Sequence, residues 1–481
     1  MRKKVVHSAS TKLTSGVGNT APETEQTPSK NGDSNAANSA AYTDAELRQF
    51  ITQERAFLRE KYLGTLPNPY SKLLSGSPEP WEDPKVSSLV HEFVEGSSQT
   101  EGISRLLIVT HAYPSMDNPY PNGFVHRRVK AYQKRGIDVS VVISNPKLPL
   151  EIREYDGVRV LSGDGSQMTA LLKTTTYTAY FVHFPTRYLW TWIEPAETNF
   201  SRWVFFIHGF EARRWVRSLE SFTSKEMVTR NIEATLYKQA FFRDILKLKE
   251  GPSTFVFVSN FVRACSELDM EIAFPDDRTQ IIHNFIDTDL FNYVEKKPED
   301  RLKILWMRSA ATMSYAPDLA VEALKILKGS PWWSRLEIRI VGEGQHFHLF
   351  EDEFCDDSNV TISTGFLPQN DIPAVHKNYG LFLTPTRFDT QGVGRDEAMA
   401  GGLVPVTNKV SAIPEFLDDK CAVLAEANDA RGLATGMIEL FENENLFLEK
   451  SVAAARQVRE LSGVGSTVER ELNLMQTKSV F

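Results

Sequence analysis

The chain has 481 residues, of which 41% are hydrophobic and 24% charged, an ordinary globular composition with enough apolar material for a sizeable core. A formal net charge of −8 excludes an overall basic footprint for nucleic acid. The three cysteines, Cys265, Cys355 and Cys421, are far apart, which excludes a disulfide framework and a cysteine-rich zinc site. No apolar run approaches the roughly 18 residues of a membrane span, and the basic start lacks the apolar stretch of a signal peptide. We therefore expect a cytoplasmic protein.

The first hundred residues have their own character. Residues 1–41 contain no aromatic side chain and one leucine, so we predict a disordered tail. In residues 42–103, a capping-box pattern at Thr43–Glu46 opens a stripe of apolar residues at helical spacing, and a segment rich in proline, serine and glutamate follows. This pattern predicts an amphipathic helix and a linker with short helical pieces. Two interpretations of the helix remain open: it packs on the protein's own body, or it docks a partner.

From Ser104 onward, short apolar runs alternate with helical stretches. This alternation predicts a parallel sheet with helices on both faces, in a first domain over residues 104–284. The predicted strands are 106–109, 139–143, 158–161, 179–183, 204–207 and 255–258, and the longest predicted helices are 124–135 and 224–249.

The alternation restarts in a second domain, residues 285–481. The predicted strands are 303–307, 336–341, 360–363, 381–384 and 404–407, with helices at 318–327 and 396–400 and largely helical sequence over 429–473. The last helices could return to the first domain. The fold class is therefore α/β, with two doubly wound halves and a ligand expected at the carboxyl ends of the strands, between them.

The segment 385–406 carries the most chemical information. Asp389 and Glu397 are eight positions apart and flank Gln391–Gly394, which leads into a short helix. Glycines allow close approach to a ligand, and a helix start offers free N–H groups to a phosphate. Glu397 could accept hydrogen bonds from a vicinal diol such as a ribose. The alternative is that Glu397 caps the helix and the glycines only form a turn.

The same segment resembles the GT-B retaining glycosyltransferases of the glycogen-synthase-like group, also called group 1 or family 4. The similarity extends over about residues 104–475. The motifs that carry it are Asp389-x7-Glu397, Ala398-Met-Ala-Gly-Gly-Leu-Val-Pro-Val406, Ile413-Pro-Glu415, Val258-Ser-Asn260, Ile281-Ile-His-Asn-Phe-Ile-Asp287 and Val341-Gly-Glu-Gly344.

This resemblance implies a GT-B fold of two Rossmann-like domains, the first for the acceptor and the second for the nucleotide-sugar donor. The implied activity is transfer of a sugar to an acceptor glycan, lipid or small molecule, with retention of anomeric configuration. The implied catalytic residues are His208, Asp389 and Arg308, and the implied donor-binding residues are Gly123, Arg308, Gly392, Val393, Gly394 and Glu397. No cofactor and no metal ion are expected, and peripheral membrane contact is left open.

Three departures from the family pattern are visible. Asp389 stands where a glutamate is usual, and Phe285 stands where a glycine is usual. The family's lysine after the arginine is absent here, and Tyr315 is nearest to its place after Arg308. A catalytically weak nucleotide-binding or scaffold protein is therefore the alternative. A nicotinamide-dependent oxidoreductase would need G-x-G-x-x-G after the first strand, and residues 110–123 lack it.

Other residues allow two interpretations each. Arg308 could pair with Asp318 or another structural acid instead of a phosphate, and His208 could be a core histidine. Residues 126–130 are expected to form a solvated helix face, with contact to an anionic acceptor as the alternative. Two further groups each have two possible places. One group could line the acceptor side or lie in a surface loop: Glu211, Arg213 and Arg214. The other could pack in the core or stack on a sugar: Tyr188, Trp190 and Trp192.

Overall fold

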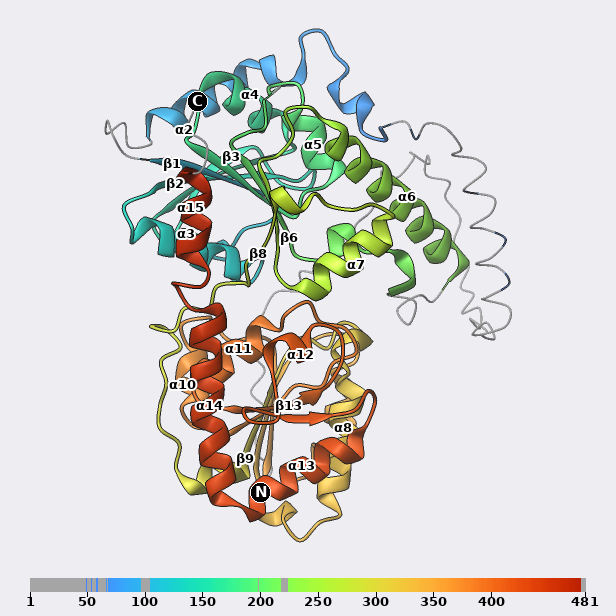
Figure 1. Cartoon of the computed structure of the whole chain (residues 1–481), viewed down its shortest axis with the longest axis vertical. Helices are drawn as coiled ribbons and strands as arrows, with labels where there is room; N and C mark the ends of the chain where they lie inside the picture. Colours follow the sequence, from blue (N-terminus) through green and yellow to red (C-terminus); the bar gives the residue numbers. More distant parts are fainter. Residues whose placement is uncertain are drawn as a thin grey trace, which may run out of the picture.

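The computed structural model describes residues 68–96, 104–197, 199–217 and 224–476, together with Gln49, Gln53, Leu58 and Leu66. The predicted tail and most of the predicted helix after Thr43 lie outside these residues; Leu58 is described as helical and is 2% exposed. Two domains lie one above the other, each built around a sheet with helices on its faces (Figure 1). The predicted α/β class with two doubly wound sheets is confirmed.

The first sheet has eight strands in the order β3-β4-β2-β1-β5-β6-β7-β8. The strands are β1 (Arg105–Thr110), β2 (Asp138–Ser144), β3 (Glu151–Tyr155), β4 (Val158–Gly163), β5 (Ala179–His183), β6 (Trp203–Ile207), β7 (Thr254–Phe257) and β8 (Thr279–Ile281). Every pair is parallel except β3 with β4. The edge strands β3 and β8 were not predicted, because neither has the continuous apolar run of a strand buried on both faces.

Successive residues of β1 point to opposite faces of this sheet. Leu107 and Val109 belong to the core under one helical layer, whereas Leu106 and Ile108 belong to the core under the other. The first layer contains α2 (Pro84–Glu95), α4 (Ser166–Thr174), α5 (Arg187–Ile193), α6 (Lys225–Lys247) and α7 (Asn260–Met270), and the second contains α3 (Gly123–Gln133).

One helical piece of the predicted linker is the 12-residue helix α2, whose Val86, Val90 and Phe93 pack into the first core. Trp190 and Trp192 are each 2% exposed in the same core, so the core interpretation of these aromatic residues is correct.

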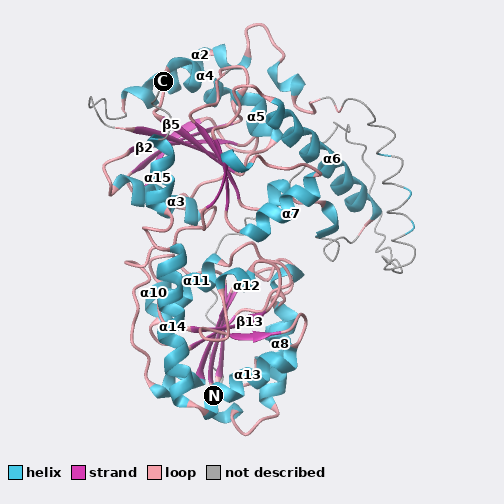
Figure 2. Cartoon of the chain, viewed as in Figure 1, coloured by secondary structure: helices cyan, strands magenta, loops and turns pink. Residues whose placement is uncertain are grey.

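The second sheet has six parallel strands in the order β11-β10-β9-β12-β13-β14 (Figure 2). They are β9 (Lys303–Met307), β10 (Glu337–Gly342), β11 (Val360–Thr364), β12 (Leu381–Leu383), β13 (Val404–Asn408) and β14 (Val423–Ala425). Its helices are α8 (Pro317–Lys328), α9 (His348–Phe354), α10 (Ile372–His376), α11 (Val393–Ala400), α12 (Ile413–Phe416), α13 (Ala430–Glu442) and α14 (Glu444–Ser462). Short 3-10 turns lie at Ser71–Leu74, Pro80–Glu82, Phe210–Ala212, Asp276–Arg278, Pro298–Leu302, Met313–Tyr315 and Trp333–Arg335. Over the described part of the chain, no helix has the length and apolarity needed to span a bilayer.

The last helix, α15 (Val468–Gln476), packs against α3 of the first domain. Nε of Arg128 donates to Oε1 of Glu471 at 2.9 Å, and the Tyr132 hydroxyl donates to the other oxygen of that carboxylate. Both charged side chains are fully buried. Because buried charges need partners, this cluster fixes α15 on the first domain.

We predict that Glu471→Ala lowers the free energy of unfolding by about 3–5 kcal/mol, because Arg128 is left buried without its counter-ion. The matched control is Glu469→Ala on the same helix, whose carboxylate is 59% exposed and lies 3.7 Å from Arg135. That exposed pair should contribute at most about 1 kcal/mol. Urea unfolding of both variants measures the difference, and equal losses would contradict the assignment.

Candidate functional site

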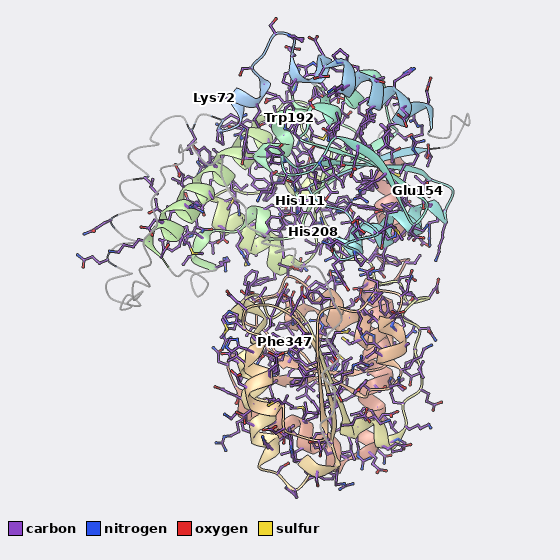
Figure 3. All side chains as sticks on the ribbon, turned by 180° about the vertical axis from the view of Figure 1, so that it is seen from behind. Lys72, His111, Glu154, Trp192, His208 and Phe347 are labelled. Carbon is purple, nitrogen blue, oxygen red and sulfur yellow. The ribbon has the colours of Figure 1, made fainter. Side chains whose placement is uncertain are left out.

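Loops at the carboxyl ends of the two sheets meet between the domains. The Ser259 hydroxyl, just after β7, donates to the Thr390 carbonyl at 2.8 Å. A Cβ on Gly209, after β6, would lie 2.6 Å from the Thr390 methyl group. Figure 3 shows His111 and His208 on the side of the first domain that is nearer the second. Because ligands of such sheets bind outside the carboxyl ends of strands, this interface is the place for a site.

Arg308 follows β9, the strand at which the order of the second sheet reverses. Its Nη1 donates to the Thr384 hydroxyl at 2.7 Å, and its Nη2 donates to Oδ2 of Asp389 at 2.5 Å. The Tyr315 ring centroid lies 4.0 Å from the guanidinium carbon. The structure therefore brings together Arg308 and Asp389, two of the predicted catalytic residues.

Arg308 does pair with an acid of this chain, as the alternative interpretation expects, but that acid is Asp389 and not Asp318. Asp318 instead binds Arg387 through two parallel hydrogen bonds of 2.8 Å each. Burial opposes ionisation of Asp318, but the hydrogen bonds and charge of Arg387 outweigh it and lower the pKa of this carboxyl.

Two glycines position the backbone that carries Arg308. A Cβ on Gly342 would lie 2.1 Å from the Arg308 carbonyl oxygen. Gly344 has a φ of +131°, and a Cβ there would lie 2.3 Å from the Ala311 nitrogen. The Val-Gly-x-Gly motif is thus needed because the loops after β9 and β10 touch through their backbones.

The helix α11 begins at Val393, three residues before its predicted start at 396. Gly392 precedes it with a φ of +100°, and no side chain caps this end. Gly394 is exposed, and a Cβ there would meet nothing within 4 Å. The first turn of the helix is therefore uncapped and has room beside Gly394, and an uncapped helix start suits an anion.

Glu397 is the fifth residue of α11 and not its cap, so the capping alternative is wrong. Its Oε1 accepts a hydrogen bond from Nη2 of Arg127, on α3 of the first domain. Burial raises the pKa of Glu397, and the Arg127 charge opposes that rise. Nη1 of Arg127 also donates to Oε1 of Gln369 at 2.6 Å.

The predicted solvated face over residues 126–130 is also wrong. His126 and Arg127 are each 7% exposed, and Arg128 is fully buried. The helix α3 lies between its own sheet and the second domain, so its polar side chains have buried partners. Nδ1 of His126, for example, lies 2.7 Å from the Tyr113 hydroxyl. Gly123 begins this helix, and a Cβ there would lie 1.9 Å from Nε2 of Gln369.

Several motif residues that are distant in sequence bind one another at the interface. Oε1 of the fully buried Gln391 accepts from the Asn284 backbone N–H at 2.6 Å, and its Nε2 donates to Asp396 at 3.0 Å. Glu415 accepts from the backbone N–H of Asn260 at 2.8 Å, at the start of α7. The sequence motifs therefore form one contiguous region, and Gln391 and Glu415 hold its two halves together.

His208, another predicted catalytic residue, follows β6 and is 7% exposed. Its Nε2 lies 3.0 Å from Nδ1 of His183, and its ring lies 4.3 Å from the Phe184 ring. Burial lowers the pKa of both histidines well below the usual value, so both are neutral at pH 7. His208 is thus in a packed environment at the face where the domains meet.

Glu211 organises the loop that begins at His208. Its carboxylate accepts from the backbone N–H of His208 at 2.5 Å and of Gly209 at 3.1 Å. Burial raises the pKa of Glu211 to about 7. Nearby, Nζ of Lys238 donates to the Phe210 carbonyl at 2.6 Å, and burial lowers the pKa of Lys238 to about 8.

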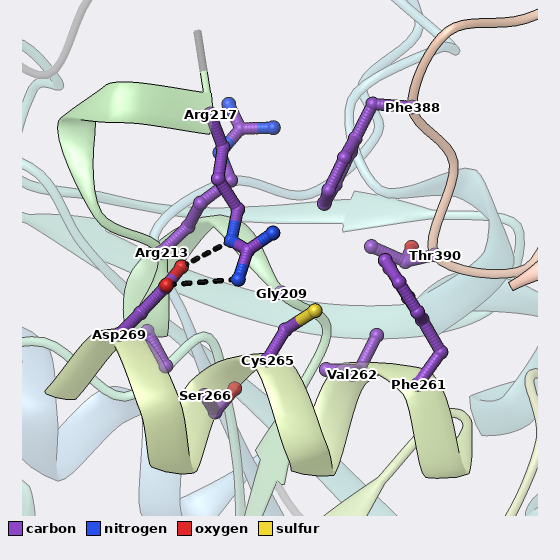
Figure 4. Close-up of a pocket in the computed structure, with 11 residues that line it drawn as sticks. Gly209, Arg213, Arg217, Phe261, Val262, Cys265, Ser266, Asp269, Phe388 and Thr390 are labelled. Carbon is purple, nitrogen blue, oxygen red and sulfur yellow. Dashed lines mark hydrogen bonds and ion pairs between the residues drawn. The ribbon is translucent and has the colours of Figure 1, made fainter. Parts of the chain in front are cut away.

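A small pocket lies beside this loop, between the first domain and the segment that leads to Asp389 (Figure 4). Arg213 reaches over the Phe388 ring, with its guanidinium carbon 5.1 Å from the ring centroid. Arg217 forms an ion pair with Asp269 at 2.5 Å on one side. Among the described residues, no group of three His, Cys, Asp or Glu side chains is placed to hold a metal ion.

Residues 302–443 match the family model described as glycosyl transferases group 1. No curated protein sequence matches the chain. Solved structures with the same fold include sucrose-phosphate synthase from Thermosynechococcus elongatus, with a TM-score of 0.59 and 15% identity over 78% of this chain and 98% of that one. Anabaena HepE in complex with UDP and glucose has a TM-score of 0.55 and 12% identity, over 78% and 100% of the two chains. WaaG, a glycosyltransferase involved in lipopolysaccharide biosynthesis, has a TM-score of 0.53 and 15% identity, over 78% of this chain and 100% of that one.

The raised pKa of Glu211 generates a prediction about stability and pH. Because the unfolded carboxyl ionises near pH 4.5 and the folded one near pH 7, stability falls as the pH rises through this interval. Glutamine does not ionise, so Glu211→Gln lacks this loss of stability. The free energy of unfolding of the variant should therefore rise by about 3 kcal/mol relative to that of wild type as the pH is raised from 4.5 to 7.

Urea unfolding at several pH values measures this change. The matched control is Glu250→Gln, at an exposed position, for which the difference from wild type should stay constant. A constant difference for Glu211→Gln as well would contradict the prediction.

Proposed function

We propose that this chain, whose two domains have the GT-B fold and whose residues 302–443 match the family model of group 1 glycosyl transferases, transfers a sugar from a nucleotide-sugar donor to an acceptor. The observation that carries the proposal is the convergence of three features at one interface. They are the uncapped start of α11, the buried carboxylate of Glu397 on the same helix, and Arg308 at the switch point of the second sheet.

Each feature suits one part of a nucleoside diphosphate. The free N–H groups of Val393 and Gly394 suit the diphosphate, because the positive end of the helix dipole favours anions. The Glu397 carboxylate suits the two ribose hydroxyls, which are hydrogen-bond donors. Anabaena HepE was captured with UDP-glucose, so UDP-glucose is the first donor to test.

In the proposed reaction, the bond between the anomeric carbon and the diphosphate oxygen breaks, and its electron pair leaves with the diphosphate. The anomeric carbon forms a new bond to the oxygen of an acceptor hydroxyl, whose proton passes to the departing diphosphate or to water. Arg308 and the start of α11 are placed to neutralise this developing charge, so we propose transfer without a metal ion. Asp389 holds the Arg308 guanidinium through Nη2 and would face the donor sugar. Neutral His208 would approach the transferred sugar from the first domain, and retention of configuration follows the family resemblance.

The acceptor is proposed to bind on the first domain. The proposed acceptor classes are a glycan, a lipid-linked sugar and a small molecule. Since WaaG is involved in lipopolysaccharide biosynthesis, lipid-linked glycans are reasonable acceptors to test first. A nucleotide-binding protein with weak turnover is the second candidate. Tyr315 supports it, because this ring packs on Arg308 where the resemblance leads us to expect a lysine.

We predict that Glu397→Gln weakens binding of the best nucleoside diphosphate by about 10-fold to 150-fold, the loss of a charged hydrogen bond of about 1.5–3 kcal/mol. Calorimetric titration of UDP, GDP and ADP into the full chain measures it. Glu439→Gln, which removes the same charge at an exposed position of α13, should bind like wild type. Unchanged affinity in Glu397→Gln would reject the donor-site assignment.

We predict that Arg308→Ala lowers the kcat of donor hydrolysis by about 100-fold, the scale observed when one preorganised donor is removed. Arg308→Lys keeps the charge but not the two-pronged grip on phosphate, so it should also lose much of the rate. The assay is run in EDTA, with melting temperatures measured in parallel and Arg335→Ala as the exposed control. An Arg308→Ala variant that melts earlier yet retains full rate would show a purely structural role.

A further inference from the structure

The carboxylate proposed for the ribose is already bound by a side chain of the opposite domain. Arg127, on α3, donates from Nη2 to Oε1 of Glu397, and the side chain of each residue is 8% exposed. Nη1 of Arg127 donates to Oε1 of Gln369, at 2.6 Å, in the loop after β11. A single guanidinium thus joins the first domain to two parts of the second.

The surroundings leave the guanidinium little freedom beside Glu397. A Cβ on Gly123 would lie 1.9 Å from Nε2 of Gln369, so the first turn of α3 is pressed against the second domain. The Phe291 ring centroid lies 5.8 Å from the guanidinium carbon of Arg127. Arg127 therefore fills the space next to Glu397 that a ribose would enter.

The hydrogen-bonding capacity of the Arg127 guanidinium is also incompletely used. Nε of Arg127 is buried and has no hydrogen-bond partner within the described part of the chain. Burial raises the pKa of Glu397 despite the charge of Arg127, so the carboxylate is held at a desolvation cost. A pair of this kind can be exchanged for another set of donors, and the two hydroxyls of a ribose are such a set.

We propose that Arg127 is a positioning residue that competes with the nucleotide for Glu397. It holds the carboxylate and joins α3 to the second domain while the site is empty. Nucleotide binding breaks the ion pair and so removes one of the contacts that join the two domains. The proposal rests on the proposed function, because it takes Glu397 as the ribose-binding group.

The test is titration of UDP, GDP and ADP into the full chain carrying Arg127→Met, which removes the charge but keeps an apolar stem of similar length. In wild type, the nucleotide can bind only to the fraction of molecules in which Glu397 is not paired with Arg127, and this lowers the apparent affinity. The variant has no such competition, so it should bind the best diphosphate at least about threefold more tightly than wild type. Arg135→Met, just beyond α3 at an exposed position, is the charge-matched control and should bind like wild type. If Arg127→Met does not fold, Arg127→Lys replaces it in the test. Lysine keeps the charge but cannot bridge Gln369 and Glu397 together, so this variant should also bind the diphosphate more tightly than wild type.

A double variant separates this inference from the proposed function. Arg127→Met with Glu397→Gln should bind as weakly as Glu397→Gln alone, because the gain acts through that carboxylate. If wild type binds a diphosphate and Glu397→Gln loses it, but Arg127→Met binds equally or more weakly, competition by Arg127 is wrong while the donor site stands. If Glu397→Gln binds like wild type, the donor-site assignment fails and this inference fails with it.

Discussion

The direction of the strands is the constraint on which the site depends. All strands of the second sheet are parallel, as are all pairs of the first sheet except β3 with β4, so the loops that follow these strands gather at one edge of each sheet. The contacts of Ser259 and Gly209 with Thr390 show that these edges meet. Arg308, Asp389 and the start of α11 all lie at this edge, although Arg308 is 81 positions from Asp389 in the sequence.

Charge neutralisation within the interface is the second organising feature. Arg308 binds Asp389, Arg127 binds Glu397, and Arg395 binds Asp396 at 2.5 Å, and the members of the last pair are each 2% exposed. Each of these three arginines is thus held by a carboxylate of this chain. Because a buried charge without a partner is costly, an anionic ligand entering here must exchange partners with these pairs and cannot simply be added to them. This explains how a site for a diphosphate can be stable before any ligand binds.

Much of this fold could be predicted from the sequence, because strands buried on both faces are continuous apolar runs, as in Ile304-Leu-Trp-Met307 of β9. The edge strand Glu151–Tyr155 escaped prediction because its residues are half-buried or exposed. The start of α11 was missed because Gly392 and Gly394 have weak helix propensity, and only the structure shows that the helix begins between them. Arg127 was assigned to a solvated face, since its partner Glu397 is 270 positions away and no local pattern reveals that pair.

The most direct test of the account is a crystal structure of the full chain with the nucleoside diphosphate that binds most tightly. The account predicts the diphosphate at the backbone N–H groups of Val393 and Gly394 and beside Arg308, with the ribose hydroxyls donating to Glu397. A nucleotide bound elsewhere, or bound at α11 with Glu397 still paired to Arg127 and no ribose contact, would contradict it.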